Sequence, residues 1–392
     1  MKQISSSITI LCIFLIFSTN PIAATNISVS NNNDADFRSI QEAIDNATIG
    51  DNVLVYPGIY TENVNVNKEI TIISHSSNSE DTIVQTASTK KNVFIVTSNN
   101  VTINGFKMLG AVTDKHGEDN AGVYLYNKTG ILIINNNITG NNLGILSIEA
   151  HNNTIKNNII IDNTLSGIDI WDSDNNLIQG NYVARSRDNG ILLWERCYNN
   201  TLIGNYVSSS RRGVGIQQYS SNTTLINNTA TGNINGFFLT RSDNCTFINN
   251  TANSNRDNGI YFATSKNSHL ENNTATKNGK SGFFMHFTLS SNLVRNIASE
   301  NQDYGIVISN YSKNNILECN IMKDNGKGDI HFVEEGNRVI NSSCNDKVPA
   351  DNVTANTTSD DSQKIPSPGI LTTFVLVVAT YLLMKFQRHQ QG

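Results

Sequence analysis

Apolar residues along most of this chain occur in short runs of three to five positions that alternate with polar residues, and Asn-rich stretches separate the runs. A glycine returns at a nearly constant interval between positions 122 and 328, first after 22 residues and then eight times after 23. A fixed period of this length indicates a repeat architecture, in which each unit buries its apolar face against its neighbours. Runs with a period of two are typical of strands, and Asn and Gly accept the left-handed backbone of sharp bends. Three runs and three bends per unit therefore predict one coil of a parallel β-helix.

Two columns of positions predict the core of this solenoid, because successive side chains of a strand point to opposite faces. The position one residue after each repeat glycine is apolar in every unit: Val123, Ile145, Ile168, Ile191, Val214, Phe237, Ile260, Phe283 and Ile306. Three residues after the glycine, only Ser147 is polar. A helical interpretation fails, since no 3.6-residue spacing persists through these runs.

Pairs of asparagines recur in the same phase of the repeat, for example at 157–158, 227–228, 249–250 and 272–273. Coils of a β-helix lie about 4.8 Å apart, so stacked amides can hydrogen-bond as ladders. The Asn excess is therefore expected to be structural.

The amino-terminal part has two distinct segments before the repeats. Residues 1–24 read as a secretory signal peptide, with Lys2, an apolar stretch over 8–17 and the small residues Ala23 and Ala24. Residues 25–48 predict a strand and an amphipathic helix that caps the open end of the stack, as solenoids require. Residues 49–345 then supply about a dozen coils of 22–24 residues.

Three further segments follow the repeats. Residues 346–367 form a polar Ser/Thr/Asn linker, 368–384 an apolar segment, and 385–392 a basic tail. This order predicts either a transmembrane anchor with a cytoplasmic tail or a surface-sorting signal of the Pro-Gly-Phe type, although Ile370 stands where that tripeptide has Phe. The protein is thus expected to be exported and held at the cell surface by its carboxy-terminal segment.

The helix-then-coil opening, with "FRSIQEAIDNA" and "GDNVLVYPGIYTENVNVNKEITIIS", and the repeated "GI…NN…N" coils together resemble the NosD-like family of right-handed β-helix proteins, also described as carbohydrate-binding and sugar-hydrolysis repeats of the pectin-lyase-like superfamily. The resemblance covers about residues 30 to 345. It implies an all-β, single-stranded, right-handed parallel β-helix, and a cell-surface or periplasmic protein of archaeal or bacterial type. Copper binding is implied by the family label alone, because no Met, His and Cys positions converge in the repeat pattern.

Charge, glycosylation triplets and cysteines indicate which partners and covalent modifications the protein can have. A net charge of -5 without a basic block argues against a nucleic-acid partner. Among the Asn-x-Ser/Thr triplets, Asn352 and Asn356 in the linker are the best candidates for glycosylation. Cys319 and Cys344 lie about one coil apart and are a candidate disulfide, whereas Cys197 and Cys245 are two coils apart and are not expected to meet.

Candidate ligand-binding residues lie on the outer face of the glycine-bearing strands, which is unusually aromatic for a solvated surface. Stacked rings suit the apolar faces of sugars, and the alternative is that another protomer or a loop covers this face. The candidates are Trp171, Trp194, Asp169, Tyr124, Tyr126 and Tyr261. The predicted partner is a polysaccharide or a cell-surface glycan.

Glu149, Asp172 and Glu195 occupy the same corner of three successive coils, five residues after the glycine, with Arg187 and Arg211 on the other edge of the strand. Carboxylates about 5 Å apart suit a retaining glycoside hydrolase, and a polysaccharide lyase would pair Asp-bound Ca²⁺ with an Arg base. The alternative is a solvated corner with local ion pairs. No proline occurs between Pro57 and Pro349, so the Asp-Pro-His-Asp string of mannuronan epimerases and the Pro-containing Arg motif of pectate lyases are absent.

Overall fold

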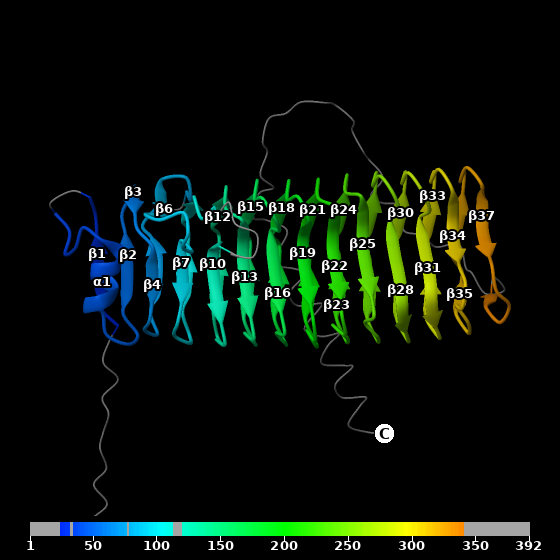
Figure 1. Cartoon of the computed structure of the whole chain (residues 1–392), viewed down its shortest axis with the longest axis horizontal. Helices are drawn as coiled ribbons and strands as arrows, with labels where there is room; N and C mark the ends of the chain where they lie inside the picture. The colour runs from blue at the N-terminus through cyan, green and yellow to red at the C-terminus, as the bar shows by residue number, and fades with distance from the viewer. Residues whose placement is uncertain (1–23, 32–33, 77, 113–119, 341–392) are drawn as a thin grey trace, which may run out of the picture. The chain divides into compact units, whose positions relative to one another are not determined.

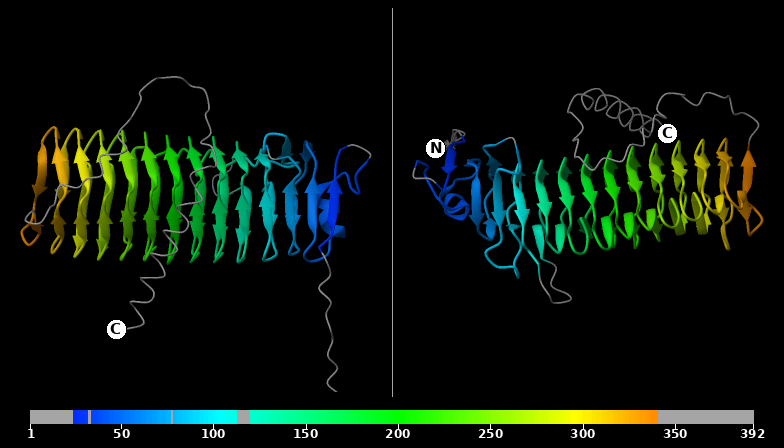
Figure 2. Two further views of the ribbon diagram at one scale, coloured as in Figure 1. Left: turned by 180° about the vertical axis from the view of Figure 1, so that it is seen from behind. Right: turned by 90° about the horizontal axis from the view of Figure 1, so that it is seen from above.

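The computed structural model describes residues 24–340, apart from 32–33, 77 and 113–119. In this part the chain forms 38 strands and one helix, and the strands build a right-handed parallel β-solenoid of about 13 turns. Figures 1 and 2 show the coils stacked side by side in chain order. The predicted fold is confirmed. By internal contacts the chain divides at residue 344 into two units, and the second unit, 345–392, lies outside the described residues.

All strand pairs are parallel, and each coil contributes one strand to each of three sheets, here called sheets A, B and C. Sheet A has 14 strands: β1 (Asn26–Val29), β2 (Asn52–Val55), β5 (Thr71–Ser74), β8 (Thr102–Asn104), β11 (Leu132–Ile134), β14 (Thr154–Lys156), β17 (Leu177–Gln179), β20 (Thr201–Ile203), β23 (Thr224–Ile226), β26 (Thr246–Ile248), β29 (His269–Glu271), β32 (Asn292–Val294), β35 (Ile316–Glu318) and β38 (Arg338–Ile340). Sheet B has 12 strands: β3 (Gly58–Thr61), β6 (Thr82–Gln85), β9 (Lys107–Leu109), β12 (Asn137–Thr139), β15 (Ile159–Ile161), β18 (Tyr182–Ala184), β21 (Tyr206–Ser208), β24 (Thr229–Thr231), β27 (Thr251–Asn253), β30 (Thr274–Thr276), β33 (Ile297–Ser299) and β36 (Ile321–Lys323). Sheet C has 12 strands: β4 (Val64–Val66), β7 (Phe94–Val96), β10 (Ala121–Tyr126), β13 (Leu143–Ile148), β16 (Ile168–Trp171), β19 (Asn189–Trp194), β22 (Arg212–Gln217), β25 (Asn235–Thr240), β28 (Ile260–Lys266), β31 (Phe283–Leu289), β34 (Tyr304–Ile308) and β37 (Gly328–Phe332).

The repeat glycines lie in or just before the strands of sheet C, where sheet C approaches sheet B most closely. A Cβ atom on Gly190 would lie 2.1 Å from Val207 Cγ1 and 2.7 Å from the carbonyl oxygen of Gly213. Real Cβ contacts do not come this close, so lack of space, and not a left-handed φ, requires glycine here. The two predicted core columns that follow each glycine are buried, including the polar Ser147.

The two members of each asparagine pair have different structural roles, one in the bend of the backbone and one in the hydrogen-bonded ladder. The first member has a left-handed backbone at the bend, with φ of 54° at Asn157. The second is buried and forms the ladder: Asn158 donates from both its backbone N–H and its Nδ2 to Asn181 Oδ1 of the next coil. The predicted amide ladder is confirmed, and it satisfies buried bend amides that no sheet pairs.

Helix α1 (Ile40–Asn46) lies at the amino-terminal end of the stack (Figure 1). Ser39 is its N-cap, and the Glu62 carboxylate accepts hydrogen bonds from the backbone N–H groups of Ile40 and Gln41, both 2.9 Å long. Ile40 and Ile44 are fully buried, and the helix contacts β1, β2 and β4.

Candidate functional site

Two aromatic rows run across the outer face of sheet C. Because equivalent residues of parallel strands are paired in register, Tyr126, Ile148, Trp171 and Trp194 form one row over β10, β13, β16 and β19. Tyr124 and Asp169 belong to a second row, two residues earlier in each strand, and Tyr261 lies in that row on β28. Six strand spacings separate Tyr124 from Tyr261, which is roughly 29 Å. The sequence-predicted ligand residues thus form two groups.

The first group is more covered than the sequence suggests. Asp169 is only 6% exposed, and Trp171 packs against an apolar cluster on the outer face that contains Ala121, Leu143 and Leu146. The indole Nε1 of Trp171 is buried and has no hydrogen-bond partner within the described residues. Trp194 is partly exposed and lies outside this cluster. Trp171 and Trp194 are thus both partly exposed, and Trp171 is the one that packs on the apolar cluster.

The second group is a regular stack of three rings. Tyr261 lies between Phe238 and Phe284, with ring centroids 4.9 and 5.4 Å apart and interplanar angles of 4° and 3°. The Arg212 guanidinium lies 4.7 Å from the centroid of the Phe238 ring and extends the stack by a cation–π contact. Burial raises the pKa of Tyr261. The candidates selected from the sequence do not include Phe238 and Phe284, although aromatic residues repeated coil by coil at one position were the available signal.

The three corner carboxylates lie where sheet C turns into sheet A. Glu149, Asp172 and Glu195 all have left-handed backbones, with φ of 51°, 45° and 58°. Asp172 accepts hydrogen bonds of 2.9 and 3.4 Å from the guanidinium of Arg196, which also lies 3.5 Å from Glu195 Oε1. These side chains are about half exposed, so their ion pairs are weak and screened by solvent. The hydrogen bonds that Arg196 donates to Asp172 raise the pKa of Arg196.

Arg187 and Arg211 lie on the opposite long edge of sheet C, at the corner that follows sheet B. The whole of β19 separates Arg187 from Glu195, a distance on the order of 20 Å for extended chain. An arginine base and a carboxylate-bound cation at these positions cannot act on the same bond. The two sets of charges thus lie on the two edges of sheet C, as the sequence pattern indicates.

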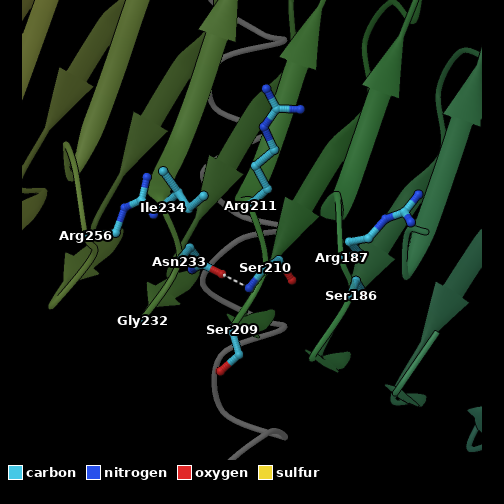
Figure 3. Close-up of a pocket in the computed structure, with 9 residues that line it drawn as sticks. All are labelled: Ser186, Arg187, Ser209, Ser210, Arg211, Gly232, Asn233, Ile234 and Arg256. Atoms are coloured by element: carbon cyan, nitrogen blue, oxygen red, sulfur yellow. Dashed lines mark hydrogen bonds between the residues drawn. The ribbon is translucent and has the colours of Figure 1, made fainter. Parts of the chain in front are cut away.

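The arginine edge carries an open hollow of about 400 Å³ (Figure 3). Its lining comes from four successive corners of the solenoid: Ser186, Arg187, Ser209, Ser210, Arg211, Gly232, Asn233, Ile234 and Arg256. Sequence reasoning noted Arg187 and Arg211 but missed the serines and Arg256.

Metal coordination is not evident in the described part of the chain, where no three His, Cys, Asp or Glu side chains gather as ligands. The soft donors that copper prefers are dispersed: Cys197 and Cys245 are buried free thiols, Met285 lies in the core, and His286 is on the outer face. These residues do not fit a copper site, and the carboxylate corner holds an arginine where a Ca²⁺ site would need further oxygens.

Several predicted features fall on or beyond the edge of the described residues. Cys319 is disulfide-bonded, whereas Cys344, its predicted partner, lies outside the described residues. The signal segment, the linker with Asn352 and Asn356, and the apolar segment 368–384 also lie outside them. Among the residues that the structure describes, none forms a helix long and apolar enough to cross a membrane.

Comparison with protein families agrees with the fold. Residues 91–252 match the family model described as right handed beta helix region, and residues 208–364 match the model described as periplasmic copper-binding protein (NosD). A curated cell surface glycoprotein of Methanothermus fervidus is 34% identical over 131 residues, which are 33% of this chain and 20% of that protein. The chain thus spans about a fifth of the length of this relative.

Solved structures with the same architecture include proteins whose names refer to polysaccharides. The catalytic domain of a GH87 α-1,3-glucanase has a TM-score of 0.61 at 14% identity, over 83% of this chain and 69% of that chain. The A-module of the mannuronan C-5 epimerase AlgE6 of Azotobacter vinelandii has a TM-score of 0.56 at 16% identity, over 76% and 92%. The family 28 exopolygalacturonase of Yersinia enterocolitica has a TM-score of 0.56 at 12% identity, over 81% and 78%. At these identities the likeness establishes the fold alone.

The fold and these matches define a right-handed parallel β-helix protein. Residues 208–364 match the NosD model, so the resemblance predicted from the sequence is confirmed over this part of the chain.

Proposed function

We propose that this protein is an exported surface β-helix that binds carbohydrate along the outer face of sheet C. The observation that carries the proposal is the ring stack of Phe238, Tyr261 and Phe284, whose members repeat at the strand spacing on one accessible sheet face. Such a row presents the edges of the stacked rings as one continuous apolar strip, against which the C–H groups of successive sugars can pack. Trp194 supplies a further partly exposed ring on the same sheet.

Export and surface location are supported by two independent features. The first 24 residues have the pattern of a secretory signal peptide, and the matched relative from Methanothermus fervidus is a cell surface glycoprotein. Attachment through residues 368–384 and glycosylation at Asn352 and Asn356 belong to this proposal. Mass spectrometry of the protein isolated from its native membrane checks both, because a retained Lys385–Gly392 peptide excludes cleavage by sorting.

The test of carbohydrate binding uses a glycan array with the purified protein, followed by two double variants. Phe238→Ala with Tyr261→Ala removes two rings of the sheet C stack, and we expect it to weaken binding of any array hit at least tenfold. The matched control removes the stacked pair Tyr182 and Tyr206 on sheet B, whose rings are 5.2 Å apart at 2°. Equal binding by the wild type and the sheet C variant contradicts the proposal.

Trp171→Ala and Trp194→Ala are best tested separately, because Trp171 belongs to the apolar cluster on the outer face. We expect Trp194→Ala to weaken glycan binding with little change in stability. Trp171→Ala is expected to lower stability as well, since it removes packing from Leu143 and Leu146. If the sheet C variants change the oligomeric state and not glycan binding, this face is a subunit interface.

Polysaccharide cleavage is the second candidate function, and the named activities of the structural neighbours favour it. In this chain it would act through Glu149, Asp172 and Glu195. Incubating each bound glycan with the protein and measuring new reducing ends or unsaturated products decides the matter. Loss of product in Asp172→Asn and Glu195→Gln, but not in Glu300→Gln at another corner, would assign the carboxylates to catalysis.

A further inference from the structure

One asparagine ladder is interrupted at the corner between sheets B and C. Its positions are occupied in successive coils by Asn141, Asn163, Ser186, Ser210, Asn233, Asn255, Asn278, Asn301 and Asn325. The asparagines from 233 onward donate to the Oδ1 of the next ladder residue at 3.0–3.1 Å from the backbone N–H, and Asn141 donates to Asn163 in the same way. At Ser186 and Ser210 the side chain is too short to continue the ladder.

Hydrogen bonds are missing around Ser186, whereas Ser210 donates its N–H to Asn233 Oδ1 at 2.9 Å and its Oγ to the carbonyl oxygen of Ser208 at 3.2 Å. In other coils the residue after the ladder position donates its N–H to the ladder carbonyl one coil earlier, as Arg256 does to Asn233 at 2.7 Å. The N–H groups of Arg187 and Arg211 form no such bond, and the N–H of Ser186 has no partner within the described residues. Ser186 Oγ is also buried without a partner, in a side chain that is 1% exposed. Buried polar groups are almost always paired, so a cluster of unpaired donors at one point of a regular ladder requires an explanation.

The break coincides with the hollow and with a local excess of positive charge. Ser186 and Ser210 line the hollow, and Arg187, Arg211 and Arg256 extend beside it (Figure 3). Arg212 and Lys280 lie on the same corner, while the nearby carboxylates are those of Asp188 and Asp257. Five cations and two carboxylates leave a net charge of +3 here, in a chain whose net charge is -5.

Arg187 is free to bind a ligand. Its guanidinium forms no ion pair or hydrogen bond within the described residues, whereas Arg211 lies 3.4 Å from Asp188 and Arg256 lies 3.7 Å from Asp257. Arginine donors and unpaired backbone N–H groups are the groups that bind oxyanions in proteins. A cation would be repelled by this corner.

We propose that the hollow at the ladder break binds an oxyanion group, a carboxylate or sulfate, carried by an acidic polysaccharide. Arg187 and Arg211, one coil apart, contact the charged group, and the N–H donors beside Ser186 complete the site. The oxyanion site stands independently of the aromatic face. The inference that a polysaccharide carries the oxyanion rests on the proposed function of carbohydrate binding. The experiment tests the site and its carrier with separate ligands.

The experiment measures binding of sodium sulfate, polygalacturonate, heparin and neutral dextran to the purified protein by titration calorimetry. Arg187→Gln with Arg211→Gln is expected to weaken sulfate and polyanion binding at least tenfold and to leave any dextran binding unchanged. The matched control, Arg241→Gln with Arg338→Gln, changes the net charge equally at other exposed positions and is expected to retain binding. Binding by the wild type should also weaken steeply with salt.

A second variant tests the ladder break itself. Ser186→Asn with Ser210→Asn is expected to restore the ladder, fill the hollow and weaken anion binding at least tenfold, while circular dichroism and the urea midpoint show an intact fold. If sulfate still binds to Ser186→Asn with Ser210→Asn as it does to the wild type, the proposed site is wrong. The site is also wrong if Arg187→Gln with Arg211→Gln and the control Arg241→Gln with Arg338→Gln lose anion binding equally. If the protein binds sulfate but neither polygalacturonate nor heparin, the inference that a polysaccharide carries the oxyanion is wrong. If polyanion binding succeeds but is unchanged in Phe238→Ala with Tyr261→Ala, the aromatic proposal fails for that ligand and the oxyanion site stands.

Discussion

The Oδ1 atom of Asn181 accepts two hydrogen bonds from Asn158, one from the backbone N–H and one from Nδ2, both 3.0 Å long. Asn181 Nδ2 in turn donates to the carbonyl oxygen of Ile155 at 2.9 Å and to Asn205 Oδ1 at 3.0 Å. One buried amide thus connects three coils, and the same arrangement repeats along the corner between sheets A and B.

Asn181→Ala is therefore expected to destabilise the solenoid by about 2 to 4 kcal/mol, because it leaves two buried donors of Asn158 without an acceptor. Urea unfolding monitored by circular dichroism measures the change. Asn292→Ala, on an exposed position of β32, is the control and should stay within about 0.5 kcal/mol of the wild type. Similar midpoints for the two variants would show that the ladder contributes little.

Gly190→Ala is expected to lower stability by about 3 kcal/mol or more, since the new methyl group would overlap Val207 and the carbonyl of Gly213. Gly204 provides a contrast, because its φ is +61° and no atom lies within 4 Å of an added Cβ. Gly204→Ala should cost only about 1 kcal/mol, through the left-handed backbone. The order of the two urea midpoints checks the spatial origin of the glycine repeat, and the reverse order contradicts it.

The stability of the folded protein is expected to depend on pH through Asp51, near the amino-terminal end. Its carboxylate accepts hydrogen bonds of 2.7–2.9 Å from the backbone and hydroxyl groups of Thr25 and Thr48, and these hold the pKa of Asp51 far below its usual range. A depressed folded-state pKa contributes stability that is present above the unfolded value of about 3.9 and is lost as the pH falls toward the folded value.

Asp51→Asn should therefore lower the urea midpoint at neutral pH and flatten its decrease in acid. Asp329→Asn, at an exposed position, is the control and should leave the pH profile unchanged. An unchanged acid branch in Asp51→Asn would remove Asp51 as the cause.

The free thiols of Cys197 and Cys245 are expected to be inert in the folded protein. Burial raises the pKa of Cys197 to about 11 and that of Cys245 to about 12, so the reactive thiolate is scarce at neutral pH. Peptide mass spectrometry after iodoacetamide treatment should find both unmodified in the native protein and both alkylated after unfolding in guanidinium chloride. Modification of either residue under native conditions would reveal local opening of its corner.

What the sequence by itself determined is the repeat. The glycine interval, the two apolar columns and the asparagine pairs each recur in phase, and a pattern repeated this often leaves one way to stack the coils. Counting coils also predicted that Cys197 and Cys245 do not form a disulfide with each other, and both thiols are free.

Only the tertiary structure decided which outer residues are accessible and which charges are neighbours. Asp169 is only 6% exposed although it lies on the outer face, between Leu146 and Leu192 in its row, and burial of that kind depends on side chains from several coils at once. Arg196 donates a hydrogen bond of 2.9 Å to Asp172 of the preceding coil, and which charges meet across coils in this way depends on how the coils are packed. The replacement of two ladder asparagines by Ser186 and Ser210 is visible in the sequence, but its consequence is a hollow, and a hollow exists only once the coils are packed.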